Sequence, residues 1–367
     1  MAPVPVVGTT FVLFAYDIGF QVDLARAERA ASEATRLRTV RQRRRAPTWF
    51  DFEPHPLRVR VATGAEQISG IAVHAEVDIT IFDFGALLVS YRLPLDMDLG
   101  DLPGLGADLY ENDAFLADSR RRAEEIRQVL GDAVERSRLR DVVEDYVIFA
   151  IERWPGELTP DDIVETHAGV LARAIEAEPG ELSAHQAQRT LEGRMSYSPG
   201  DLTLVDWNAA ILFDAAGEDI VTLLQHANVE LLELRVLDGE LDDLLDHADD
   251  TLSELYGRHW FAVRSLERIM ERYASAQTDA AVLFEGVNNA IKLFGNQYLS
   301  RVYRMTSERL DLPGWQRSVM RKLDAADSLY QKLSDAAGTK RMETLEWVII
   351  VLITLSIVLM FFPIGGH

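Results

Sequence analysis

The sequence offers few side chains at the spacings that metal or nucleophilic chemistry needs. It contains no cysteine, eight histidines, and 59 aspartates and glutamates. The lack of cysteine excludes thiol nucleophiles, thiolate zinc sites and iron–sulfur ligands. No histidine lies in His-Glu-x-x-His or His-x-His spacing, and there is neither a Gly-x-Ser-x-Gly elbow nor a Gly-x-x-x-x-Gly-Lys-Ser/Thr loop. We therefore predict no catalytic residue, metal or cofactor, and paired carboxylates remain the open alternative.

Two short motifs look like binding signatures but lack the required context. Gly104-Leu105-Gly106 begins like a dinucleotide-binding motif, but Leu109 stands at the third glycine position. We expect a helix over about 107–134 after it. Asp83-Phe84-Gly85 is also the metal-binding triplet of protein kinases, whose His-Arg-Asp catalytic loop is absent here. We interpret Asp83, Phe84 and Gly85 as the turn of a β-hairpin.

This hairpin has a second copy further along the chain. The segment LTLVDWNAAILF at 202–213 echoes ITIFDFGALLVS at 79–90, so that Asp206, Trp207 and Asn208 fall on the second turn. Glycine and asparagine end the two turns, and both tolerate the left-handed backbone that a tight hairpin requires. A hairpin turn explains both copies, whereas a kinase motif explains neither.

The echoes extend to the strands that precede the hairpins. YVIFAI at 146–151 matches FVLFAY at 11–16 position by position. A helix is expected over about 160–177, where Thr159-Pro160 is a typical start signal. The pattern predicts an α+β fold of two tandem strand-helix-strand-strand-helix units, at 1–140 and 141–217.

Long helices follow the second unit. Between residues 218 and 344, apolar residues recur at spacings of three, four and seven, which predicts a helical coiled-coil stem. Leu312-Pro313-Gly314 breaks the pattern before the last helix. The acidic run from Asp238 to Asp250 lacks calcium-loop spacing, so we interpret it as the solvated face of the coiled coil.

The last stretch of the chain is apolar. Residues 347–364 carry no charge, and as a helix they would be roughly 27 Å long, close to the ~30 Å of a hydrocarbon core. We therefore predict one transmembrane helix at 345–364, which would make the protein tail-anchored. The expected anchor residues are Leu345, Glu346, Trp347, Ile349, Ile350, Leu352, Ile353, Leu359, Phe361 and Phe362.

The charges of the sequence indicate which partners the protein can bind and which side of a membrane its soluble part would face. The net charge is −22, which repels phosphate backbones and argues against specific nucleic-acid binding. Lys340 and Arg341 precede the apolar stretch, which predicts that the soluble part faces the cytoplasm, or the mitochondrial matrix in an organelle.

One dense basic block interrupts the acidic sequence. Its arginines could contact anionic lipid headgroups or ribosomal RNA, or form a solvated helix end and linker. They are Arg36, Arg38, Arg41, Arg43, Arg44 and Arg45.

Part of the chain resembles a known family. Leu345-Glu346-Trp347-Val348-Ile349-Ile350 is similar to the membrane signature Leu-Glu-Trp-Ile-Ile-Ile of the "required for meiotic nuclear division" family, a domain of unknown function. Asp83-Phe84-Gly85 resembles that family's Asp-Tyr-Gly strand turn. The resemblance implies a membrane-tethered, oligomer-forming protein without known catalysis, whose mitochondrial relatives support organellar translation. Ser356 stands where members commonly carry an intramembrane glutamate.

These observations leave two functions open. The first is a non-catalytic, tail-anchored scaffold or tethering protein that self-associates through its helical stem, with membrane lipid, further copies of itself and a ribosome or other membrane protein as partners. The alternative is a ligand-binding or enzymatic α+β head held at the membrane, with its site between the two units.

Overall fold

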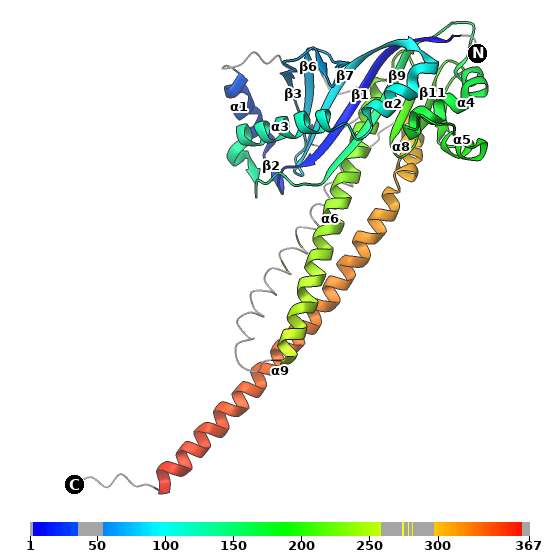
Figure 1. Cartoon of the computed structure of the whole chain (residues 1–367). Coiled ribbons are helices and arrows are strands. Elements are labelled where there is room, and N and C mark those ends of the chain that lie inside the picture. The colour runs from blue at the N-terminus through cyan, green and yellow to red at the C-terminus, as the bar shows by residue number, and fades with distance from the viewer. Residues whose placement is uncertain are drawn as a thin grey trace. The chain divides into compact units, whose positions relative to one another are not determined.

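The computed structural model describes residues 3–35, 54–257, 274, 278, 281 and 297–361 (Figure 1). These described residues form two compact units. Unit 1 comprises those within Met1–Val236 and Leu283–Gln316, and unit 2 comprises those within Leu237–Val282 and Arg317–His367. Unit 1 combines a sheet with helices, which confirms the predicted α+β class.

The strands belong to unit 1. Those described are β1 (Pro5–Asp17), β2 (Gln21–Val22), β3 (Leu57–Ala62), β4 (Gln67–Ile68), β5 (Ile71–Ala72), β6 (Glu76–Ile81), β7 (Ala86–Asp98), β8 (Val134–Glu135), β9 (Val143–Arg153), β10 (Arg194–Met195), β11 (Leu202–Val205) and β12 (Ala209–Phe213). Among them, eight form one mixed sheet in the order β10-β11-β12-β9-β1-β7-β6-β3. The strands from both expected tandem units therefore share a single sheet, joined where β1 pairs with β9.

The two halves of the sheet have the same strand order but a different direction at one step. Outward from the central β1–β9 pair, β7, β6 and β3 follow β1, and β12, β11 and β10 follow β9. However, β7 is antiparallel to β1, whereas β12 is parallel to β9. The second half is therefore not a simple copy of the first.

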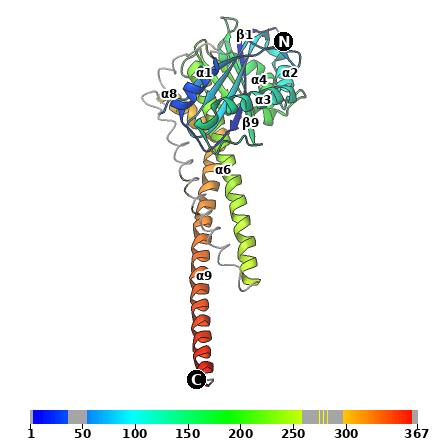
Figure 2. The ribbon, with the colours of Figure 1, turned by 90° about the vertical axis from the view of Figure 1, so that its left-hand side faces the viewer.

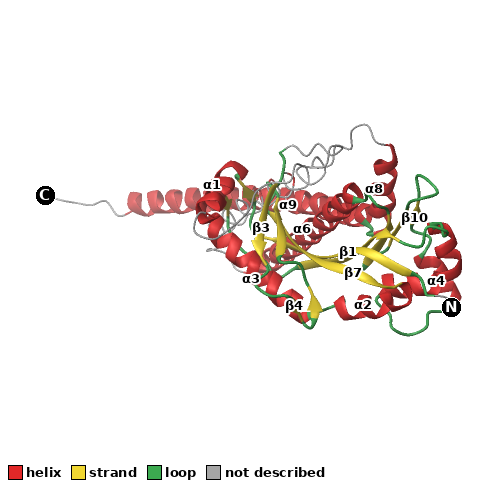
Figure 3. Ribbon diagram, turned by 90° about the horizontal axis from the view of Figure 1, so that it is seen from above, coloured by secondary structure: helices red, strands yellow, loops and turns green. Residues whose placement is uncertain are grey.

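Helices cover both faces of the sheet. Those described in the chain are α1 (Leu24–Thr35), α2 (Leu102–Leu109), α3 (Asp113–Leu130), α4 (Pro160–Glu176), α5 (Ala184–Thr190), α6 (Glu218–Gly257), α8 (Gln297–Arg309) and α9 (Leu312–Phe361), with 3₁₀ turns at Leu99–Asp101 and Gly131–Ala133. In unit 1, α2, α3 and α4 lie on one side of the strands, and α8 and the first half of α6 lie on the other (Figure 3). Successive residues of a strand face opposite sides, so Phe14 joins the core beneath the first helices while Ala15 faces the second layer.

The helix expected over about 160–177 is confirmed as α4, and its start signals act as predicted. The Thr159 hydroxyl accepts from the Asp162 backbone N–H, and the Asp162 carboxylate accepts from the Thr159 backbone N–H, which forms a capping box. The helix expected over 107–134 is instead two helices, α2 and α3. Glu111 between them has a left-handed φ of 47°, and the Asn112 side chain caps the start of α3.

Unit 2 contains a parallel pair of helices, formed by the second half of α6 and the adjoining part of α9 (Figure 2). The Lys322 ammonium lies 2.8 Å from the Asp238 carboxylate and 2.6 Å from the Asp242 carboxylate. One turn further along α9, Ala326 is fully buried and packs against Leu244 and Leu245. The contacts advance in the same direction along both helices, so within this unit the helices run parallel.

The predicted transmembrane anchor is wrong. Within the part of the chain that the structure describes, no helix is long and apolar enough to cross a membrane. The predicted stretch, from Leu345 onward, is the end of the 50-residue helix α9. The membrane localisation, and the orientation toward the cytoplasm or the matrix inferred with it, lose their basis.

The residues predicted to form the anchor lie near the end of α9. Five of them are exposed there: Glu346, Ile349, Ile350, Leu352 and Ile353. Leu345, Trp347, Leu359 and Phe361 belong to the helix, and Phe362 lies outside the described residues.

We expect Gly85→Ala to destabilise unit 1 more than Gly70→Ala does. Both glycines have a positive φ, 97° and 80°, so alanine strains the backbone at either position by about 1 kcal/mol. Only at Gly85 would the added Cβ collide with another part of the chain, 1.9 Å from the Gly19 carbonyl oxygen; at Gly70 it meets open space. Urea unfolding should show a loss at least twice as large for Gly85→Ala, and equal losses would contradict this role for the hairpin turn.

Candidate functional site

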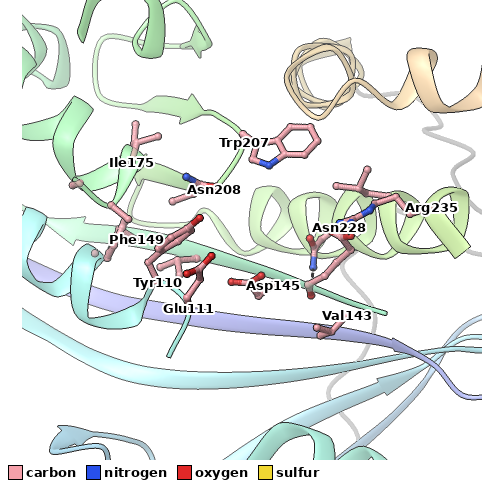
Figure 4. A pocket seen from close by; sticks show the side chains of 17 residues that line it. Tyr110, Glu111, Val143, Asp145, Phe149, Ile175, Trp207, Asn208, Asn228 and Arg235 are labelled. Carbon is pink, nitrogen blue, oxygen red and sulfur yellow. Dashed lines mark hydrogen bonds and ion pairs between the residues drawn. The ribbon is translucent and has the colours of Figure 1, made fainter. Parts of the chain in front are cut away.

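Unit 1 has a pocket beside the start of β9, which we call the β9 pocket (Figure 4). Its volume is about 140 Å³, and its walls include Tyr110, Glu111, Asp145, Trp207, Asn228 and Arg235. These residues come from the end of α2, from β9, from the turn between β11 and β12, and from α6. The pocket therefore gathers residues from distant parts of the sequence.

The register of the sheet creates this pocket. Strand β9 begins at Val143, but its pairing with β12 begins only at Val147, opposite Ala209. In the described structure, β12 therefore leaves the first residues of β9 uncovered along that edge. The turn that starts β12 carries Trp207 and Asn208 to the pocket at this point.

A close helix contact closes one end of the pocket. The Cα of Gly106 on α2 approaches α4 so tightly that a Cβ there would lie 2.7 Å from the Ala174 carbonyl oxygen. This packing explains the glycine of the Gly104-Leu105-Gly106 motif without a nucleotide. Tyr110, at the end of the same helix, is 43% exposed and lines the pocket.

An ion pair between a buried carboxylate and a 39% exposed guanidinium forms one wall. Glu144 is only 6% exposed, and its carboxylate accepts a hydrogen bond from the Arg235 guanidinium of α6. The Asn228 side-chain amide donates to the backbone carbonyl of Glu144 at 3.4 Å. Burial raises the pKa of Glu144 to about 7, and Arg235 opposes that rise. This carboxyl group can therefore exchange a proton near neutral pH.

Two further carboxylates lie at the opening of the pocket. Figure 4 shows Asp145 directed toward Glu111, and Tyr110 next to them. Desolvation raises the pKa of Asp145, and the negative charge of Glu111 adds to the rise, which Arg235 offsets only in part. The opening therefore carries concentrated negative charge. Among the described residues, no group of three or more His, Asp or Glu side chains has an arrangement that could hold a metal ion.

The two predicted hairpin turns lie where the sequence places them but have different surroundings. Asp83, Phe84 and Gly85 connect β6 to β7, and Phe84 is 4% exposed, its ring stacked on Phe82 with centroids 5.2 Å apart. Burial raises the pKa of Asp83.

The second turn is open instead of buried. Asp206, Trp207 and Asn208 connect β11 to β12, and Trp207 is 47% exposed beside the β9 pocket. The Tyr146 hydroxyl donates to the Asp206 carbonyl at 2.8 Å, which holds this turn against β9. The structure thus brings one of the two predicted turns into the candidate site.

The arginines of the predicted basic contact lie outside the described residues. They are Arg36, Arg38, Arg41, Arg43, Arg44 and Arg45.

The first half of α6 also buries carboxylates away from the pocket. Glu230 is 1% exposed and accepts from the Tyr303 hydroxyl at 2.6 Å and from the Gln316 amide at 3.3 Å. Glu233 is 2% exposed. Desolvation raises the pKa of Glu233, the negative charge of Asp17 on β1 raises it further, and Arg140 lowers it. Burial raises the pKa of Glu230 to about 7 and that of Asp17 to about 6.

Sequence reasoning missed Glu144, Asp145 and Arg235. The ion-paired residues are 91 positions apart, and no motif connects them. The apolar seam of α6 runs through Ala227 and Leu231 and passes beside Asn228 and Glu230, so the seam itself gave no signal of these polar contacts.

The fold and pocket define an α+β protein with one mixed sheet, covered by helices on both faces. The profile of a protein family described as "Uncharacterized protein MJ0711, N-terminal domain" matches residues 7–219. Because this match covers more than half of the chain, the chain belongs to that family. The matched region begins within β1, continues through β12 and ends as α6 begins.

A relative with a similar sequence is the uncharacterized protein MJ0711 of Methanocaldococcus jannaschii. It is 22% identical over 224 residues, which cover 59% of this chain and 66% of the relative, just under two thirds of its length. No solved structure matches the chain. These findings support membership in a family of uncharacterized domains, and they provide nothing on meiotic nuclear division or membrane anchoring.

We expect Arg235→Met to destabilise the protein in a pH-dependent way. The variant leaves the Glu144 carboxylate without its cation, and because the carboxyl group can take up a proton instead, the loss at pH 8 should be on the order of 1 kcal/mol. The loss should be near zero at pH 5, where Glu144 is protonated in the fold. Urea unfolding at both pH values measures it, and Glu144→Gln in the same background should restore most of the stability. An equal loss at both pH values would show that packing, not charge, is the cause.

We expect Glu230→Gln to stabilise the protein at pH 8. The folded pKa of about 7 lies above the ordinary 4.5, so the unfolded chain releases its proton first as the pH rises. Glu230 therefore lowers the free energy of unfolding progressively between about pH 4.5 and 7. Glutamine removes that effect, which is on the order of 3 kcal/mol at pH 8 and near zero at pH 4. The exposed Glu218→Gln is the control, and an unchanged pH profile in Glu230→Gln would disprove the assignment.

Proposed function

We propose that the protein is a non-catalytic scaffold whose chains associate with one another through the apolar end of α9. The observation that supports this most directly is a run of six apolar residues, Val348 to Ile353, each of which is 49–58% exposed. A helix turns 100° per residue, so six successive apolar residues present apolar surface on every side. Continuous exposed apolar surface of this kind usually marks an interaction site.

A second copy of the chain suits this surface. The protein carries a net charge of −22, and like charge opposes contact between copies over most of the sequence. From Trp347 to the end at His367 the sequence has no aspartate, glutamate, lysine or arginine. Copies that meet along this segment bury apolar surface without bringing carboxylates together. The parallel packing of α6 and α9 in unit 2 is a similar helix contact within one chain.

Three finer interpretations remain proposals beside this one. The shared strand order of the two sheet halves supports an origin as two tandem repeats, although the direction of β12 differs. The similarity of Leu345–Ile350 to the "required for meiotic nuclear division" family would fit an oligomeric protein. The arginines between Arg36 and Arg45 would suit an anionic partner such as a ribosome.

Ligand binding by the α+β head is a second candidate function. The β9 pocket favours it, because buried polar groups and exposed aromatic rings line the same cavity. It does not depend on self-association, since every residue that lines this pocket belongs to unit 1.

We expect Ile350→Glu to convert a self-associated protein into a monomer. A carboxylate at the centre of the apolar run would have to be buried in the contact between copies, which should raise the dissociation constant at least a hundredfold. Size-exclusion chromatography with light scattering over a range of concentrations measures the mass. Met320→Glu is the matched control, because Met320 is a 44% exposed apolar residue of the same helix outside the run. A monomeric parent protein, or an oligomer that survives Ile350→Glu, would refute the proposal.

A further inference from the structure

We infer that the β9 pocket binds a small organic cation, namely an aliphatic primary amine such as one end of a polyamine. This inference deepens the second candidate function and is independent of self-association. It depends on four features of the pocket: its partly balanced carboxylates, its aromatic walls, its buried polar side chains and its size.

The negative charge at the opening is only partly balanced, by Arg235. Within the described part of the chain, neither Asp145 nor Glu111 forms an ion pair, and the nearby Arg235 is paired to the Glu144 carboxylate. Both residues are exposed, and desolvation by the pocket walls, followed by the charge of Glu111, raises the pKa of Asp145. Two neighbouring carboxylates that repel each other are stabilised when a cation binds between them. An anionic ligand would meet repulsion in the same place.

The aromatic wall includes Trp207, and neither the turn geometry nor packing in the core explains a tryptophan at this position. Trp207 stands 47% exposed on the β11–β12 turn, whereas Phe84, its counterpart on the β6–β7 turn, is 4% exposed and packs on Phe82. Packing therefore accounts for Phe84 but not for Trp207. In Figure 4, Trp207 lies across the pocket from Tyr110, which is 43% exposed. Two exposed rings around a cavity attract a cation through their faces and cover the methylene groups beside it.

Buried polar side chains also line the interior of the pocket. Asn228 is 1% exposed and Glu144 is 6% exposed, and both line it. The side chain of Asn208 borders the same space. A primary ammonium carries three N–H donors, which the carboxylates of Asp145 and Glu111 and an amide oxygen can accept together. A quaternary ammonium has no N–H donor and would leave these acceptors unsatisfied.

The size of the pocket limits the ligand. Its volume of about 140 Å³ is comparable to that of an engineered cavity that holds one benzene molecule, on the order of 150 Å³. An aminoalkyl group of about five or six heavy atoms fits this space, and a nucleotide does not.

Calorimetric titration of the full chain with putrescine tests the inference. The parent protein should bind with a dissociation constant below about 1 mM at low salt, in the range that weak single-site ligands show. Asp145→Asn and Trp207→Ala should each weaken binding at least tenfold, while Trp207→Phe, which keeps an aromatic face, should lose less than threefold. Asp96→Asn is the matched control, because Asp96 is an exposed aspartate on β7 of the same sheet, and it should bind as the parent does. Circular dichroism establishes that each variant is folded.

Several results would overturn the inference. These are the absence of binding to the parent protein, unchanged binding in Asp145→Asn, or an equal loss in Asp96→Asn, which would indicate diffuse attraction to an acidic surface. Tetramethylammonium should bind at least tenfold more weakly than putrescine, and tighter binding would refute the primary-amine class. The Ile350→Glu variant should bind putrescine normally, so that a failure of self-association and a failure of ligand binding remain distinguishable.

Discussion

The head depends on the burial of the first half of α6, a helix that is enclosed on almost every side. From Ile220 to Leu237 nearly every residue is buried, and five of the buried residues are polar: Thr222, His226, Asn228, Glu230 and Glu233. Burying polar groups is costly unless partners satisfy them, so the elements around α6 have to supply those partners. Tyr303 of α8 donates to Glu230, and Asn228 donates to the backbone of β9. The second helical layer is thereby fixed in register on the sheet.

The same constraint produces the pocket. Arg235 of α6 reaches back to Glu144, at the start of β9, where β12 no longer covers the strand edge. A β12 that began earlier would fill this space with a strand and leave no room for Asn228 to reach the Glu144 carbonyl. Strand β9 therefore pairs with β12 only from Val147 onward, and before that point the Asn228 side chain of α6 donates to the Glu144 backbone carbonyl. The short parallel strand and the polar helix together supply hydrogen-bond partners to the backbone of β9.

Local patterns in the sequence predicted local structure well and long-range structure poorly. Thr159-Pro160 correctly predicted the start of α4, because a capping box needs only neighbouring residues. The pairing of β1 with β9 and the parallel direction of β12 could not be predicted, because both depend on which strand edges meet after folding. The long pair between Glu144 and Arg235 has the same origin. The apolar end of α9 was misinterpreted, because uncharged composition alone does not define what surrounds a helix.

The end of α9 and the β9 pocket differ in how much negative charge they carry. The end of α9 has no charge, so contact there avoids the repulsion that a net charge of −22 creates elsewhere. The β9 pocket does the reverse, since the exposed residues Glu111 and Asp145 concentrate negative charge at its opening. Natural folds usually pair such carboxylates with arginine, as Glu144 is paired here. Glu111 and Asp145 repel each other and have no ion-pair partner among the described residues, so a cation bound between them would relieve that repulsion.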